Sequence, residues 1–292
     1  MQNPEEAAFY SQLGRPVKYE VPSEIPTPNN PPWSSWTAVG VWLLSIFFIV
    51  VIPGLFLFPY LISNGITLKD NPAELRHFLL TDRIAVWLQL APILLAHLAT
   101  LGVAWVVVTR ANRFSFRQTL GWDWNGFKIW HGLAIFAGFY VFSIIMVSIL
   151  GKVENDFDRM LASSSSAVYL VGFFATFTAP ITEEVVYRGL LYSAFQRRLG
   201  IIAAAILATV LFTAVHVLQY SDQGAPDYAT LIVLLGLSAA LTFIRVKTGN
   251  LLPCIVLHTI FNGLQVVLLI FETYSRSPET QEQTATAIRF FK

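Results

Sequence analysis

Residues 166–198 read SAVYLVGFFATFTAPITEEVVYRGLLYSAFQRR, and this stretch places two adjacent carboxylates, Glu183 and Glu184, behind an uncharged apolar run. An ionisable side chain near the interior of a bilayer costs at least a few kcal/mol, so it is usually retained for a function. Two further apolar segments follow, each with one histidine, His216 or His258. Carboxylates and imidazoles are the material of general acid–base catalysis. The stretch therefore predicts a membrane-embedded fold with a chemical site inside it.

The composition supports a membrane protein. Of the 292 residues 55% are hydrophobic and 13% charged, with a mean hydropathy of +0.58, whereas a soluble domain carries about 25% charged residues. Uncharged runs, each near or above the roughly 20 residues that cross a bilayer as a helix, cover residues 36–62, 84–109, 129–150, 160–182, 199–220, 228–244 and 248–271. We therefore predict an all-α, polytopic transmembrane helical bundle with about seven spans. Its compactness suggests a bacterial cytoplasmic membrane.

Pro180 complicates the count of spans. A helix over residues 166–198 would be far longer than one span, and proline removes a backbone hydrogen bond from a helix interior. We therefore expect a kink or a break at Pro180. A full break would raise the number of spans to eight.

The rest of the sequence sets limits on partners and organisation. The net charge of +1 gives no basis for nucleic-acid binding, and a single cysteine, Cys254, allows no intramolecular disulfide. The first residues are polar and rich in proline, so we expect an irregular, exposed tail. We divide the chain into a Pro-rich tail (1–34), three N-terminal transmembrane helices (35–155), a catalytic helical core (160–272) and a polar C-terminal tail (273–292).

The basic residues of the loops predict an orientation. They cluster in alternate loops, at Arg110, Arg113, Arg117, Lys128, Arg197, Arg198, Arg245 and Lys247. Cytoplasmic loops carry the excess of lysine and arginine. The pattern places the N-terminus inside and the C-terminus outside.

The segment Glu183-Glu184-Val185-Val186-Tyr187-Arg188 separates its two carboxylates by helix geometry. Glu184 and Arg188 are four residues apart, so they share a face and can form an ion pair. Glu183 points about 100° away. This division predicts that Glu183 is the working base and that Glu184 and Arg188 support it. The alternative is a plain interfacial pair near a helix N-terminus.

Two histidines on later segments complete the candidate site. A turn near residues 199–200 predicts an antiparallel hairpin in which Glu183 and His216 reach the same depth. Phe212, one turn before His216, is expected to pack beside it. His258 and Asn262 share a helix face and can both donate hydrogen bonds to a developing oxyanion, although polar contacts between helices would use the same residues. The isolated His97 and His131 are expected to be satisfied or interfacial.

Taken together, Glu-Glu-x-x-x-Arg, Phe-x-x-x-His and His-x-x-x-Asn, each in its own apolar segment, resemble the CAAX protease and bacteriocin-processing family, which includes the type II CAAX prenyl endopeptidases and is also called the Abi family. The resemblance covers about residues 160–272. It implies an intramembrane endopeptidase that cleaves a hydrophobic or lipidated peptide or a membrane protein in the lipid bilayer. It further implies that Glu183 and His216 activate water, that His258 and Asn262 form the oxyanion hole, and that Glu184 and Arg188 hold Glu183.

The sequence also allows other mechanisms and functions besides a water-activating intramembrane endopeptidase. Glu183, His216 and His258 could supply a zinc site, but no His-Glu-x-x-His is present and we expect no cofactor. Cys254 lies four residues before His258 and could act as a nucleophile, although buried cysteines are usually inert. A non-catalytic membrane partner, such as an immunity or sensor-modulating protein, would carry the same residues. A proton-coupled transporter is less favoured because no internal repeat is detected.

Overall fold

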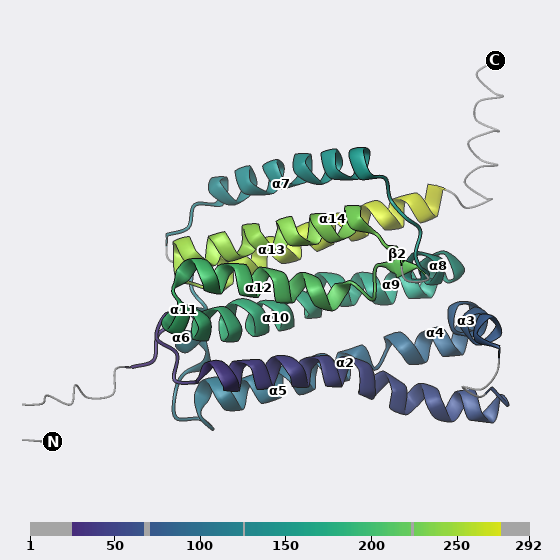
Figure 1. Ribbon diagram of the computed structural model, residues 1–292, viewed down its shortest axis with the longest axis horizontal. Helices are drawn as coiled ribbons and strands as arrows, with labels where there is room; N and C mark the ends of the chain where they lie inside the picture. The colour runs from purple at the N-terminus through teal and green to yellow at the C-terminus, as the bar shows by residue number, and fades with distance from the viewer. Residues whose placement is uncertain (1–24, 67–70, 125, 223–224, 276–292) are drawn as a thin grey trace, which may run out of the picture.

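The computed structural model describes residues 25–66, 71–124, 126–222 and 225–275, and in the last helix the side chains as far as residue 271. Long helices lie side by side along one axis (Figure 1), and the strands in these residues are one two-residue pair, β1 (Ser221–Asp222) and β2 (Ala225–Pro226). The predicted all-α class is confirmed. The helices are α2 (Ser35–Ser63), α3 (Pro72–Thr81), α4 (Arg83–Leu90), α5 (Ile93–Thr109), α6 (Phe116–Leu120), α7 (Ile129–Leu150), α8 (Asp156–Ser163), α9 (Ser165–Phe173), η1 (Phe174–Thr178), α10 (Ala179–Glu184), η2 (Val185–Tyr192), α11 (Ser193–Leu199), α12 (Ile201–His216), α13 (Tyr228–Thr248) and α14 (Leu252–Ser275).

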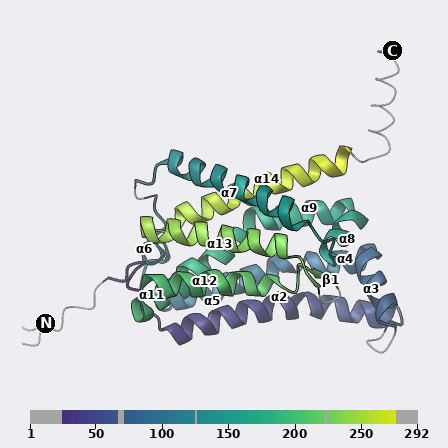
Figure 2. The ribbon, with the colours of Figure 1, turned by 45° about the horizontal axis from the view of Figure 1, so that its top comes forward.

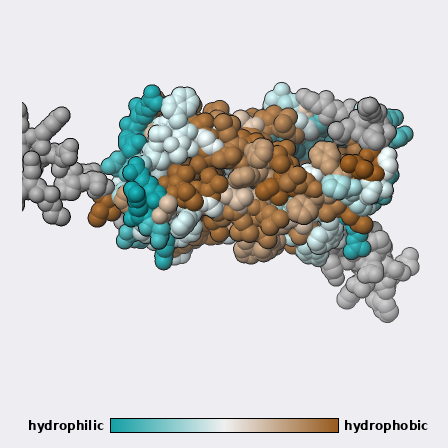
Figure 3. Space-filling view, turned by 90° about the horizontal axis from the view of Figure 1, so that it is seen from below, coloured by the Kyte–Doolittle hydropathy of each residue, from teal (hydrophilic) through white to brown (hydrophobic). Residues whose placement is uncertain are grey.

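The helices are stacked in layers across the bundle. α2 and α5 lie on one side and α7 on the other, while α9 to α14 fill the space between them (Figures 1 and 2). The outer helices α2 and α7 bury few side chains and turn large apolar ones outward. Seen from below, the surface carries a hydrophobic band between hydrophilic patches near the two ends (Figure 3). A band of this kind is expected of a protein that faces lipid.

Six helical segments in the described residues are long and apolar enough to cross a membrane. They are Ser35–Ser63, Arg83–Thr109, Ile129–Leu150, Ser165–Leu199, Tyr228–Thr248 and Leu252–Phe271. The seventh expected run, residues 199–220, forms only the 16-residue α12, because Gly200 (φ +84°) turns the chain at its start and the helix ends at His216. The chain is thus a multi-pass integral membrane protein by its six candidate spans, with one shorter apolar helix.

Pro180 does not break its helix. Residues 165–199 form one continuous helical segment of 35 residues, so the eight-span alternative is wrong. The reason lies in η1, a π-helical turn directly before the proline. The Ala179 N–H donates to the Phe174 carbonyl, five residues back. This wider register absorbs the position at which proline supplies no N–H.

Residues 25–34 of the Pro-rich tail are docked in part. Pro26, Pro31 and Trp33 are buried, whereas half of these residues are exposed, so the expected exposure holds for only part of the segment. Three arginines at one end of the bundle donate to proline carbonyls: Arg245 to Pro28 (2.7 Å), Arg197 to Pro31 (2.6 Å), and Arg110 to Pro32. The Trp33 indole is buried and donates to the Leu190 carbonyl at 3.1 Å. Carbonyls of prolines are available because these residues form no regular backbone ladder. Residues 1–24 and 276–292 of the two tails lie outside the described residues.

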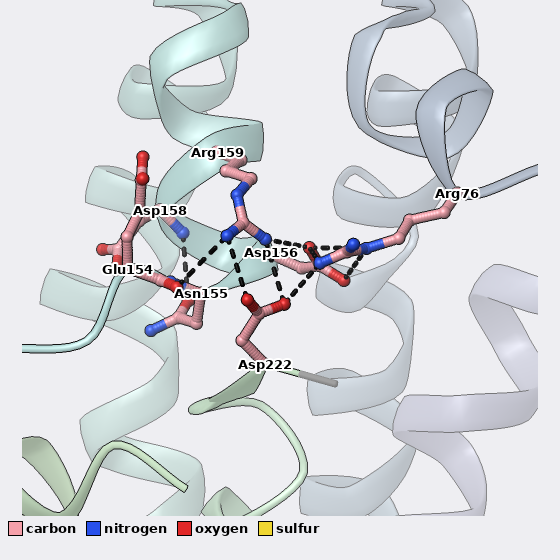
Figure 4. Close-up of polar contacts among 7 residues, drawn as sticks. All are labelled: Arg76, Glu154, Asn155, Asp156, Asp158, Arg159 and Asp222. Carbon is pink, nitrogen blue, oxygen red and sulfur yellow. Dashed lines mark hydrogen bonds and ion pairs between the residues drawn. The ribbon is translucent and has the colours of Figure 1, made fainter. Parts of the chain in front are cut away.

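The opposite end of the bundle is joined by ion pairs between α3, α8 and the loop after α12 (Figure 4). Arg76 and Arg159 each bind both Asp156 and Asp222; the Arg76 Nε lies 2.9 Å from Asp156 and the Arg159 Nη2 lies 3.0 Å from Asp222. The hydrogen bonds from Arg76 lower the pKa of the Asp156 carboxyl, and those from Arg159 lower the pKa of Asp222. These four residues, here called the ionic cluster, tie three separate segments together.

Candidate active site

Glu184 and Arg188 form a buried ion pair within the continuous helical segment of residues 165–199. The Arg188 Nη1 lies 2.8 Å from the Glu184 Oε1, and both side chains are 0% exposed. The Arg188 guanidinium also donates to the Ser238 hydroxyl (2.8 Å) and to Thr242 (3.3 Å) on α13. It lies 4.9 Å from the centre of the Phe212 ring. The predicted i, i+4 pair is present, and it fixes η2 against α12 and α13.

His258, on α14, lies between the two adjacent carboxylates. Its Nδ1 is 2.9 Å from the Glu184 Oε1, and its Nε2 is 3.7 Å from the Glu183 Oε2. A carboxylate accepts and cannot donate, so the Nδ1 carries the proton of the bond to Glu184. Glu184 therefore contacts His258 directly, and Arg188 is linked to this ring through Glu184. The other oxygen of Glu184, Oε2, is buried without a hydrogen-bond partner among the described residues.

Glu183 occupies a more open position than its neighbour. Its side chain is 25% exposed, whereas Glu184 is fully buried. The Glu183 carboxylate is near enough to Tyr187 and Tyr220 to interact with them electrostatically. The helix rotation expected between neighbouring residues thus separates an enclosed, paired carboxylate from an accessible one.

His216 is connected to the His258 side of this site by the ring of Phe212, which packs against both histidines. Phe212 lies 4.8 Å from the His216 ring and 6.2 Å from the His258 ring, measured between centroids. The Nδ1 of His216 donates to the Phe212 carbonyl at 2.7 Å, which leaves its Nε2 as an acceptor. Tyr220 stacks on the other side of His216 at 6.3 Å. The described residues contain no hydrogen bond between Glu183 and His216.

Asn262 is tied to the π turn before Pro180. Its Nδ2 donates to the Ala175 carbonyl at 2.8 Å. In the π register this carbonyl would face the nitrogen of Pro180, which has no hydrogen. Asn262 therefore satisfies a carbonyl that the helix itself leaves free, and its amide nitrogen has a second N–H beyond this bond.

The structure gives less support to the two alternative chemistries, a zinc site and a cysteine nucleophile. Among the described residues no three His, Cys, Asp or Glu side chains are grouped to hold a metal ion, so Glu183, His216 and His258 do not form a ligand cluster. Cys254 is fully buried, and its sulfur lies 3.3 Å from the Leu241 carbonyl and 3.8 Å from that of Asn250. Neither partner is a base that could activate a thiol.

Several residues near the site were not singled out by the sequence. Ser238 and Thr242 are four apart in an apolar helix, and this spacing could have marked them as one polar stripe. Tyr220 carries no such signal, because its position depends on the loop after α12. His97 was expected to be satisfied, and its Nδ1 indeed lies 2.8 Å from the Thr178 hydroxyl.

Ionisable side chains inside a bundle of membrane helices mark a functional site. Comparison with known families indicates the kind of site. Residues 165–264 match the family described as type II CAAX prenyl endopeptidase, Rce1-like, and these residues are a domain of that family. The match spans all seven motif residues and confirms the resemblance predicted from them. No curated protein and no solved structure matches the chain.

Proposed function

We propose that this protein is an intramembrane endopeptidase that hydrolyses a hydrophobic or lipidated peptide, or a membrane protein, with water activated by Glu183 and His216. The observation that carries the proposal is the division of the two neighbouring glutamates. Glu184 is enclosed and neutralised by Arg188, whereas Glu183 is partly exposed and faces His258. The membership of residues 165–264 in a family of prenyl endopeptidases supports the same reaction.

In the proposed reaction Glu183 removes a proton from water while the water oxygen attacks the scissile carbonyl carbon. His216 assists through its Nε2, the nitrogen that its bond to the Phe212 carbonyl leaves open. His258 and Asn262 donate hydrogen bonds to the developing oxyanion. For this role the Nε2 of His258 carries a proton as well as the Nδ1. Because Glu184 is already paired with Arg188, the Glu183 carboxylate, 3.7 Å from the His258 Nε2, balances this charge before it takes the proton, and the oxyanion balances it afterwards. The C–N bond then breaks, and the proton passes from Glu183 to the leaving amine.

The organisation of the chain follows from the same proposal. Residues 160–272 carry the catalytic groups, while residues 35–155 contain three membrane-spanning segments that face lipid and support them. The end with Arg110, Arg197 and Arg245 faces the cytoplasm, as the excess of basic residues there favours. A bacterial cytoplasmic membrane is the proposed location. The mechanism proposed for hydrolysis uses no metal ion.

A cleavage assay tests the function. The full chain in liposomes is incubated with a farnesylated peptide that has a C-terminal CAAX sequence and, separately, with an unprenylated hydrophobic peptide. The products are identified by mass spectrometry. We expect a cleavage product with the wild type and with the exposed-site control Glu74→Ala, and none with Glu183→Ala. Full loss of activity in metal-free protein, with rescue by zinc, would contradict the proposed mechanism.

A comparison of membrane-associated peptides in wild-type and Glu183→Ala cells identifies the natural substrate. We expect at least one peptide to accumulate uncleaved in the variant cells. Identical peptides and an unchanged phenotype would instead identify a non-catalytic membrane partner.

A further inference from the structure

Two helices outside the family-matched region place polar side chains on either side of Glu183. On α5 the His97 side chain is 7% exposed and its Nδ1 lies 2.8 Å from the Thr178 hydroxyl, five residues before Glu183. On α2 the Trp42 indole donates at 3.1 Å to the hydroxyl of Tyr187, four residues after Glu183. Both helices are otherwise strongly apolar. A buried polar group in such a helix needs a partner or a function.

The contact of His97 is made to the π turn η1. The Thr178 hydroxyl lies 2.8 Å from the His97 Nδ1 and 3.4 Å from the Phe174 carbonyl, so it is held between α5 and the π turn. The edge of the His97 ring also faces the Phe174 ring, with 6.5 Å between centroids and 85° between planes. His97 therefore contacts both the first and the last residue of η1, Phe174 and Thr178.

The register of η1 sets the direction of Glu183. A π turn inserts one residue into the α-helical repeat, and each residue rotates the helix by about 100°. Reversion of η1 to the α register would turn Glu183 away from His258 by about this angle. Two side-chain bonds hold the turn from outside, His97 on α5 and Asn262 on α14.

We propose that His97 is a positioning residue for the hydrolysis: it fixes the π turn Phe174–Thr178 and thereby aims the Glu183 carboxylate at the reacting water. This inference rests on the proposed function. Glu183 also lies near enough to His97 for an electrostatic interaction between them. The N-terminal helices thus contribute to the geometry of the active site, in addition to supporting it.

The test compares His97→Ala, His97→Asn and Thr178→Val. The first and third remove the bond, whereas asparagine can place an N–H near the position of the imidazole Nδ1. We expect His97→Ala and Thr178→Val each to lower kcat by between about tenfold and 100-fold with KM little changed, and the double variant to lower it no further. His97→Asn should recover most of the rate. His131→Ala, an exposed histidine on α7, is the matched control and should keep the wild-type rate.

A second measurement does not depend on cleavage. We expect His97→Ala to speed hydrogen exchange at the amides of residues 174–184, while Glu183→Ala leaves exchange there unchanged. Unchanged exchange in His97→Ala, or additive losses of kcat in the double variant, would overturn the assignment. If the wild type cleaves no substrate, the proposed hydrolysis fails, and the exchange experiment alone then decides whether His97 holds the turn.

Discussion

The N-terminal helices and the family-matched core both consist of apolar helices, but they differ in where their polar atoms lie. In the core, all eight residues of η2 (Val185–Tyr192) are buried, and they include the charged Arg188. In α2 and α7 the large apolar side chains, such as Phe47 and Ile144, face outward. The comparison teaches that hydropathy locates the membrane-embedded helices, whereas the pairing of buried polar groups locates the site.

This difference predicts that substitutions have large effects in the core and small effects in the outer helices. In the core a single polar side chain has several partners, so its loss leaves buried groups without hydrogen bonds. In the outer helices a lipid-facing side chain has few protein contacts, so its loss changes little.

The largest expected effect is on activity and concerns His216. His216→Ala should lower the rate of peptide cleavage by about 10²–10⁴-fold, because a positioned acid–base group contributes this much. Phe47→Ala on the outer face of α2 should leave the rate unchanged. Both variants are assayed in liposomes with the same peptide. A His216→Ala protein that is folded and as active as wild type would remove His216 from the mechanism.

The next effect is on stability and concerns the buried ion pair. Arg188→Met should destabilise the protein by about 3–5 kcal/mol, because it leaves the Glu184 charge buried without its partner. The double variant Glu184→Leu/Arg188→Met should regain much of this loss. Arg113→Met, at an exposed arginine, should stay within about 0.5 kcal/mol of wild type. Reversible unfolding in mixed micelles measures all three, and equal losses in the single and double variants would contradict the account.

Sequence alone predicts the parts of this molecule that depend on local spacing. The Glu184–Arg188 pair follows from four-residue spacing, and the hairpin at Gly200 follows from the apolar runs on either side. The contact of His258 with both glutamates does not follow, because α14 meets α10 only through tertiary packing. The sequence predicts a kink or a break at Pro180. The break does not occur, because the π turn directly before Pro180 accommodates it within a continuous helix. His97 is isolated in the sequence, and the expectation that it is satisfied is confirmed. Its partner, Thr178, could not be predicted, because it lies 81 residues away.

A smaller effect concerns the ionic cluster at the end of the bundle. The pKa of Asp222 is lowered in the folded protein by Arg159, so its contribution to stability is present above the ordinary pKa of aspartate, about 4, and is lost as the pH falls through the lowered value. The difference in unfolding midpoint between wild type and Asp222→Asn should be constant from pH 7 to about pH 4 and shrink below it. It should also shrink in 1 M salt, to which the buried Arg188 pair is less sensitive. A difference that grows in acid would have the wrong sign.

The smallest effect is expected at Cys254. Cys254→Ser should keep the rate of cleavage within about twofold, because the hydroxyl can donate to the Leu241 carbonyl as the thiol does. Treatment with a thiol-reactive reagent should likewise leave the rate unchanged, since the side chain is fully buried. A folded but inactive Cys254→Ser protein would restore the cysteine nucleophile as an alternative.

The two adjacent glutamates allow the most direct test, because Glu183→Gln and Glu184→Gln make the same chemical change one residue apart. Cleavage rate and unfolding midpoint are measured for both variants in one preparation series. We predict that Glu183→Gln lowers the rate at least about 100-fold and keeps the wild-type midpoint, while Glu184→Gln lowers the midpoint. Wild-type cleavage by Glu183→Gln, or an equal loss of stability in both variants, would contradict the division of roles between the two carboxylates.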